Sequence, residues 1–199
     1  MLSFADLSMI LISFFILMLS FTQVDKRKAE LVASSMQEQK TVRPADNLVS
    51  ISNHLEDILK KLKLDKNAEV AIDGNGVSIE FKDGLLFAFG SAEPNPRFRQ
   101  TVSKVMDLIA KTPAKYQLKF EGHTDDTPIL GGKYPSNWEL SSARGISLLR
   151  QFESRGIAVN RMAVMAYAHT RPKILVQNLK GEDLLKARSA NRRVVIRIE

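Results

Sequence analysis

An apolar run from Leu2 to Phe21 opens the sequence, and a single carboxylate, Asp6, interrupts it. About 20 consecutive apolar residues are the length that a helix needs to cross the hydrocarbon core of a bilayer. An ionisable side chain inside such a helix costs about 2.5 to 3.5 kcal/mol, so its presence indicates a function, usually in an ion pathway. We therefore predict a single transmembrane helix over residues 1–22, with Asp6 as a group that carries an ion.

The same segment could be a secretory signal. A cleavable signal has a basic n-region, a shorter apolar core and a small-x-small cleavage site, and the first 21 residues have none of these. We therefore interpret the segment as an uncleaved anchor. Lys26, Arg27 and Lys28 follow it and no Lys or Arg precedes it, so the positive-inside rule alone would place the rest of the chain in the cytoplasm.

Asp6, Ser13 and Ser20 are spaced by seven residues. A helix drifts only about 20° per heptad, so the three polar groups form one stripe. We expect the stripe to face protein rather than lipid, which implies partner helices, because one helix cannot enclose an ion path. The serines could instead bond back to helix carbonyls, but that alternative leaves Asp6 unexplained.

Composition restricts the remaining chemistry. The sequence has no cysteine, which excludes disulfides, thiolate metal ligands and cysteine nucleophiles, and its three histidines leave little for a metal site. The net charge is +7. The basic clusters at 26–28 and 60–63 are not interleaved with aromatic residues, so we do not expect nucleic acid as a partner.

We interpret residues 23–66 as a connecting segment. The stretch from Asp25 to Gln39 is charged and compatible with a helix, and Arg43-Pro44 breaks it. Apolar residues then recur at spacings of three and four from Leu48 to Leu62, which predicts an amphipathic helix ending near Lys63.

Residues 67–199 are expected to form one α/β domain, an α+β sandwich. The predicted strands cover 68–72, 77–81, 116–120, 163–167 and 194–198, and a further apolar run covers 85–89. The first two strands flank Asp73-Gly74-Asn75-Gly76 and should form a hairpin. Pro96 opens one predicted helix, and Ser136 with Glu139 forms a capping box that opens another.

Polar side chains gather after the strand at 116–120, in the sequence Gly122-His123-Thr124-Asp125-Asp126, and again at Asn137, Arg144 and 191–193. His123 and Asp125 could be a metal or acid/base pair, but no third ligand is evident, and we do not expect an enzyme. An aspartate with an arginine is better suited to binding a zwitterion, because the carboxylate takes an ammonium and the guanidinium takes a carboxylate.

The sequences LLFAFGSA, EGHTDDTPI, NWELSSARG, RPK and SANRRVVIRI follow in that order over residues 85–198. Together they resemble the OmpA-like peptidoglycan-binding domain. The resemblance implies a β-sheet layered on helices and a ligand that contains diaminopimelate, an amino acid of the peptidoglycan peptide stem. It also implies that Asp125 binds the ammonium of diaminopimelate and Arg144 its carboxylate, with Asn137 and Arg192 in support.

The sequence SFADLSMILISFFILMLSFTQVD over residues 3–25 is similar to the membrane helix of the flagellar stator B subunit, the MotB/PomB family, and is closer to the sodium-type PomB. The resemblance implies that Asp6 carries a proton or a sodium ion, with no cofactor, and that residues 25–40 form a plug. It further implies a homodimer, an A-type stator subunit that contacts the rotor, and an inner-membrane location with a periplasmic C-terminal domain.

Two features depart from that family. Its members carry a basic cytoplasmic tail before the helix, and only five residues precede Asp6 here. A missing tail would explain the inverted charge signal, so we keep the family topology. The loop between Gln177 and Arg188 also looks longer than usual. The alternative functions are a non-conducting membrane-tethered wall anchor and an energiser of the TolR or ExbD kind, and the OmpA-like motifs argue against the energiser.

Overall fold

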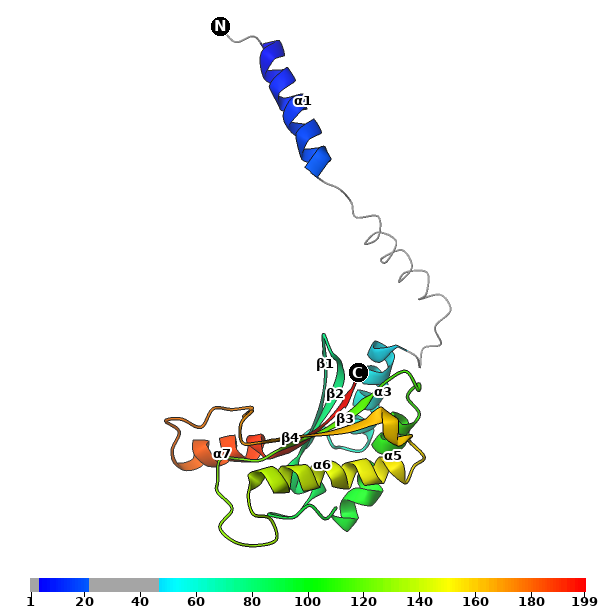
Figure 1. The fold of residues 1–199 in the computed structure, drawn as a ribbon, viewed down its shortest axis with the longest axis vertical. Coiled ribbons are helices and arrows are strands. Elements are labelled where there is room, and N and C mark those ends of the chain that lie inside the picture. The colour runs from blue at the N-terminus through cyan, green and yellow to red at the C-terminus, as the bar shows by residue number, and fades with distance from the viewer. Residues whose placement is uncertain (1–3, 22–46) are drawn as a thin grey trace. The chain divides into compact units, whose positions relative to one another are not determined.

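The computed structural model describes residues 4–21 and 47–199, which belong to two compact units, residues 1–43 and 44–199 (Figure 1). The first unit contains helix α1 (Phe4–Phe21), and this helix includes Asp6. The Ser13 hydroxyl donates to the carbonyl of Met9 at 2.8 Å, which confirms back-bonding for that serine. Among the described residues, no helix has both the length and the apolarity that crossing a membrane requires. The predicted plug, residues 25–40, lies outside the described residues.

The second unit is built on a five-stranded sheet in the order β1-β2-β5-β3-β4. Strands β3 and β4 are parallel, and all other neighbours are antiparallel. The strands are β1 (Ala68–Asp73), β2 (Gly76–Lys82), β3 (Leu118–His123), β4 (Met162–Ala168) and β5 (Arg193–Ile198). The predicted hairpin and all five predicted strands are confirmed, although β3 starts two residues later than predicted and continues to His123.

Three long helices pack on one face of this sheet (Figure 1). They are α3 (Leu48–Lys61), α5 (Pro96–Ala110) and α6 (Asn137–Glu153), all of which the sequence predicts. The sequence did not predict the short helix α4 (Asp83–Leu86), the 3-10 turn at Val159–Arg161, or helix α7 (Gly181–Asn191). The apparently long loop between Gln177 and Arg188 thus contains most of α7.

The core lies between the helices and alternate residues of the strands. Val77, Ile79 and Phe81 of β2 are fully buried, whereas the intervening Ser78 and Glu80 point to the other face. Leu55 of α3, Val105 of α5 and Phe152 of α6 complete the same cluster. The alternation gives the sheet one apolar face and one charged face, which is typical of a two-layer α+β fold.

Helix α6 lies close to β3 and β4 at two glycines, one on a strand and one on the helix. A Cβ atom added at Gly122 of β3 would collide with the backbone carbonyl oxygen of Ser141 in α6. A Cβ added at Gly145 of α6 would come within 2.5 Å of Val164 Cγ1 in β4. The two glycines therefore set the height of α6 above the parallel pair β3 and β4.

We predict that Gly122→Ala lowers the free energy of unfolding of the full-length protein by about 1 to 3 kcal/mol, because the backbone of Ser141 must shift to admit the methyl group. Gly84→Ala is the matched control, since nothing lies within 4 Å of a Cβ at that position. Urea unfolding in detergent, followed by circular dichroism, checks both. Equal midpoints for Gly122→Ala and Gly84→Ala would contradict the close contact.

Candidate ligand-binding site

A pocket of about 400 Å³ lies beside the end of β3 and the first turns of α6. Its walls come from residues 89–90, the loop at 124–134, α6, and the residue that follows α7. All four residues predicted to bind peptidoglycan line it, namely Asp125, Asn137, Arg144 and Arg192. The fold therefore brings together side chains that lie far apart in the sequence.

Asp125 is nearly buried and its carboxylate is already paired. Oδ2 lies 2.5 Å from Nη1 of Arg192, and Oδ1 accepts the backbone N–H of Thr127 at 3.1 Å. Asn137 Nδ2 donates to the carbonyls of Thr127 at 2.9 Å and of Asp125 at 3.4 Å. The start of α6 thus fixes the loop that carries Asp125, and Arg192 fixes the carboxylate.

Helix α6 begins where the sequence predicts. The Ser136 hydroxyl accepts the N–H of Trp138 at 3.1 Å and donates to the carboxylate of Glu139. This cap places Asn137 in the first turn, and Arg144 two turns further along the same helix.

Arg144 is the largest fully buried side chain of the described residues, with 1% exposure. Its Nε donates to the carbonyl of Ser91 at 3.0 Å, and its Nη2 lies 2.7 Å from Oδ2 of Asp83. The guanidinium carbon also lies 5.5 Å from the ring centre of Phe87. Arg144 is therefore paired with Asp83, whereas Asp125 is paired with Arg192.

Asp83 opens α4 and is 4% exposed. Burial raises the pKa of Asp83 to about 6, and the positive charges of Arg144 and Arg192 only partly oppose this. Burial also lowers the pKa of Arg144, against the attraction of Asp83. Both side chains carry charge at neutral pH. Arg144 does so because an arginine remains protonated in proteins, and Asp83 does so because neutral pH lies above its pKa of about 6.

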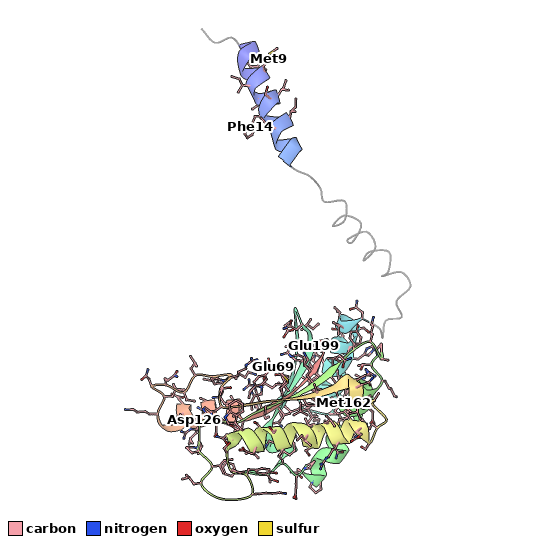
Figure 2. The ribbon with its side chains drawn as sticks, in the orientation of Figure 1. Met9, Phe14, Glu69, Asp126, Met162 and Glu199 are labelled. Carbon is pink, nitrogen blue, oxygen red and sulfur yellow. The ribbon has the colours of Figure 1, made fainter. Side chains whose placement is uncertain are left out.

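A third ion pair lies at the rim, between Asp126 and Arg188 of α7. The guanidinium donates to both carboxylate oxygens, with Nε–Oδ1 and Nη2–Oδ2 both at 2.8 Å. These hydrogen bonds hold the pKa of Asp126 below its usual value. Figure 2 shows Asp126 next to α7, at the opposite end of the sheet from Met162. Helix α7 is thereby attached to the loop that follows β3.

His123 is not brought into the pocket with Asp125. It is 3% exposed, its ring lies 5.2 Å from the ring of Tyr167, and its Nε2 lies 3.6 Å from a carboxylate oxygen of Glu121. Residues 4–21 and 47–199 contain no group of three or more His, Cys, Asp or Glu side chains arranged to hold a metal ion. The geometry gives no support to the metal or acid/base interpretation of His123 with Asp125.

The pocket is lined by both charged and apolar side chains. Asp125, Arg144, Arg192 and Lys133 are its charged lining residues, and Phe89, Pro128, Ile129 and Leu130 are among its apolar ones. Such a site fits a small ligand that carries both an ammonium and a carboxylate on an aliphatic chain. Sequence reasoning missed Asp83 and Ser91, which hold Arg144, and Arg188, which holds Asp126 at the rim, because only the fold shows these contacts.

We predict that the Asp126–Arg188 pair stabilises the fold at neutral pH by less than about 1 kcal/mol, as is usual for a partly exposed pair. Because the folded-state pKa of Asp126 is lowered, this contribution is present above about pH 4 and is lost as pH falls through the folded-state pKa. Urea unfolding of wild type and Asp126→Asn from pH 7 to pH 3 should give curves that converge at the acid end. Asp57→Asn, on the exposed side of α3, is the control. A constant difference for Asp126→Asn down to pH 3 would contradict the prediction.

Comparison with protein families gives two matches. Residues 86–196 match the OmpA family, and residues 1–39 match the family described as membrane MotB of the proton-channel complex MotA/MotB.

Two relatives from Bacillus subtilis are similar in sequence. The uncharacterized protein YtxE is 29% identical over 220 residues, which cover 100% of this chain and 87% of YtxE. Motility protein B is 25% identical over 154 residues, which cover 77% of this chain and 56% of that protein. The chain therefore matches little more than half the length of Motility protein B.

Two solved structures share the fold. The cell wall anchor of the type VI secretion system (T6SS) from Pseudomonas aeruginosa has a TM-score of 0.61 and 26% identity, covering 71% of this chain and 94% of that structure. A MotB-like protein from Desulfovibrio vulgaris has a TM-score of 0.66 and 22% identity, covering 76% and 90%. The mixed sheet with helices on one face is thus the fold of known MotB-like and wall-anchoring domains.

Proposed function

The chain belongs to the OmpA family and carries a MotB-like segment at its start, and on that premise we propose that it is a stator subunit of the flagellar motor. In this proposal the pocket anchors the protein to peptidoglycan. The N-terminal segment forms an ion channel with an A-type subunit, and the flow of protons or sodium ions through that channel drives flagellar rotation.

One observation supports the anchoring function most directly. The same pocket is lined by Asp125, Asn137, Arg144 and Arg192. Diaminopimelate carries an ammonium and a carboxylate on the same carbon. Asp125 would bind the ammonium, and Arg144 would bind the carboxylate through the edge of its guanidinium that neither Ser91 nor Asp83 occupies. Arg192 and Asn137 would hold Asp125 and its loop in position. In this role the pocket would bind a ligand and would catalyse no reaction.

The apolar lining suits the rest of the ligand. Phe89 and Leu130 lie on the pocket and are 86% and 93% exposed, so a bound molecule could cover them. The aliphatic chain of diaminopimelate would lie against this lining and remove apolar surface from water.

The membrane function rests on the first unit. Along α1 the described apolar side chains are exposed, among them Met9 at 72%, Ile10 at 66% and Phe14 at 61%. Met9 and Phe14 lie on different sides of the helix (Figure 2). Large exposed apolar surfaces indicate contact with a membrane or with other proteins. We propose that residues 1–22 form a single inner-membrane span with the C-terminal domain in the periplasm. Two copies of the chain would assemble with A-type subunits, Asp6 would carry the ion, and residues 25–40 would act as a plug.

A non-conducting wall anchor is the second candidate, and the likeness to the T6SS cell wall anchor favours it. That function would use the pocket in the same way but would need no carboxylate at position 6. The two candidates therefore differ in what Asp6 does, and the pocket cannot distinguish them.

We predict that Arg144→Ala weakens binding to purified sacculi by about 1.5 to 3 kcal/mol, which is about 10- to 150-fold in affinity, because a charge-assisted hydrogen bond is lost. Co-sedimentation of the full-length protein with sacculi measures the effect. Arg150→Ala changes an exposed arginine on the same helix and should bind as wild type does. Circular dichroism must show that the variant is folded, and wild-type binding by folded Arg144→Ala would refute the assignment.

We predict that Asp6→Asn abolishes swimming in a strain that lacks its own B subunit, while the protein still inserts into the membrane. Loss of the titratable group removes the ion carrier, because an amide takes up no proton and holds no charge. Ser8→Ala, on the same helix but outside the stripe of Asp6, Ser13 and Ser20, is the control, and it should swim. Swimming speed at matched expression is the measurement, and varying sodium would identify the ion. Normal swimming by Asp6→Asn would refute the ion-carrying role of Asp6. Failure of both wild type and Asp6→Asn to swim, despite membrane insertion and binding to sacculi, would favour the non-conducting anchor.

A further inference from the structure

We propose that Asp83 is a positioning residue of the pocket and that its carboxylate competes with the ligand's carboxylate for Arg144, so that ligand affinity rises when Asp83 takes up a proton. The inference rests on the proposed binding of a carboxylate-containing ligand at Arg144, and it adds a regulating group to that site.

The geometry shows how Asp83 holds Arg144. Asp83 Oδ2 lies 2.7 Å from Nη2, and the carbonyl of Ser91 accepts from Nε at 3.0 Å. Together with the face of Phe87 at 5.5 Å, these contacts fix one edge of the guanidinium against the segment that links β2 to α5. Among the described residues no acceptor reaches Nη1, so this group is left for a ligand in the pocket that Arg144 lines.

The position of Asp83 is also fixed. Its backbone N–H donates to the carbonyl of Arg192 at 3.0 Å, which joins the start of α4 to the end of α7. The charged groups that act on its carboxyl are Arg144 of α6, Arg192 after α7 and Asp125 after β3, two cations and one anion. Its second oxygen, Oδ1, is buried and has no hydrogen-bond partner among the described residues.

A buried carboxylate with an unpartnered oxygen is less costly in its protonated form. Burial accordingly raises the pKa of Asp83 to about 6, so the group changes its charge close to physiological pH. Protonated Asp83 can still accept a hydrogen bond from Arg144, but it no longer neutralises the guanidinium. Arg144 then presents a full uncompensated charge to the pocket.

Binding of a second carboxylate beside Arg144 places another anion near Asp83 and raises the pKa of Asp83 further. The complex therefore holds more protons than the free protein, and linkage requires the affinity to increase as pH falls through the two pKa values. If the ligand raises the pKa of Asp83 by one unit, affinity is about tenfold higher below both values than above them. The carboxylates of diaminopimelate stay ionised between pH 5 and pH 8 and do not obscure the effect.

The test measures binding of the full-length protein in detergent to meso-diaminopimelate and to purified sacculi from pH 5 to pH 8. Wild-type affinity should rise by up to about tenfold toward pH 5. Asp83→Asn keeps an oxygen acceptor for Arg144 but has no charge, so its affinity should not vary with pH and should equal or exceed that of wild type at pH 8. Asp83→Ala loses the support of Arg144 and should bind weakly at every pH. Asp57→Asn should follow the wild-type profile.

A purely structural role for Asp83 would leave the pH profile of folded Asp83→Asn parallel to that of wild type, and this result would overturn the proposal. If Asp83→Asn does not fold, calorimetry of wild type in two buffers of different ionisation enthalpy replaces it. Net proton uptake on binding near pH 6 supports the proposal, and its absence overturns it. Wild-type binding by Arg144→Ala would instead show that the proposed site itself is wrong, which separates the two failures.

Discussion

A guanidinium can be buried beneath a helix only if acceptors and a counter-charge are buried with it, because a lone charge in a protein interior is very costly. Arg144 receives both from one segment, through Asp83 and the carbonyl of Ser91. This segment follows β2, whereas Arg144 belongs to α6, so the ion pair connects two parts of the chain that enter the core separately. The pocket exists because this connection holds the 83–91 segment against α6, with Phe89 and Arg144 in its wall.

The other charged residues of the pocket lie at the end of β3, and the topology of the sheet explains why. Strands β3 and β4 are parallel and α6 connects them, so the end of β3 lies next to the first turn of α6. Gly122 and Gly145 let the helix approach closely enough for Asn137 to bond to the loop after β3.

The charged face of the sheet has a different role. There Lys173 bridges Glu69 and Glu80, which face each other across β1 and β2, at 2.8 and 2.7 Å. These contacts relieve repulsion between neighbouring strands.

Local patterns in the sequence predicted the elements with a clear period or cap, namely α3, α5, α6, the hairpin and all five strands. The resemblance over residues 85–198 also named four residues that the fold brings into one pocket, and their part in binding peptidoglycan stays a prediction. Local patterns missed α7, whose only buried residues are Ala187 and Asn191, so it has no apolar stripe to detect. They also missed the pairing of Arg144 with Asp83 and of Asp125 with Arg192. Pairings between distant residues depend on the tertiary fold, and one sequence carries no local signal for them.

The internal pairing has a consequence for how such a site would bind the wall. A ligand would share Arg144 with Asp83 and Asp125 with Arg192, so each new contact is made to a charge that is already partly neutralised, and a single pocket is expected to bind only modestly. The wall is a polymer that presents many identical peptide stems. In the proposed homodimer, two linked pockets would bind this polymer much more tightly than either alone, because the second binding event is intramolecular. In the proposed stator, weak single sites would allow the subunit to exchange on the wall, whereas two together would hold it still. Ion flow could turn a rotor only if such a stator did not move.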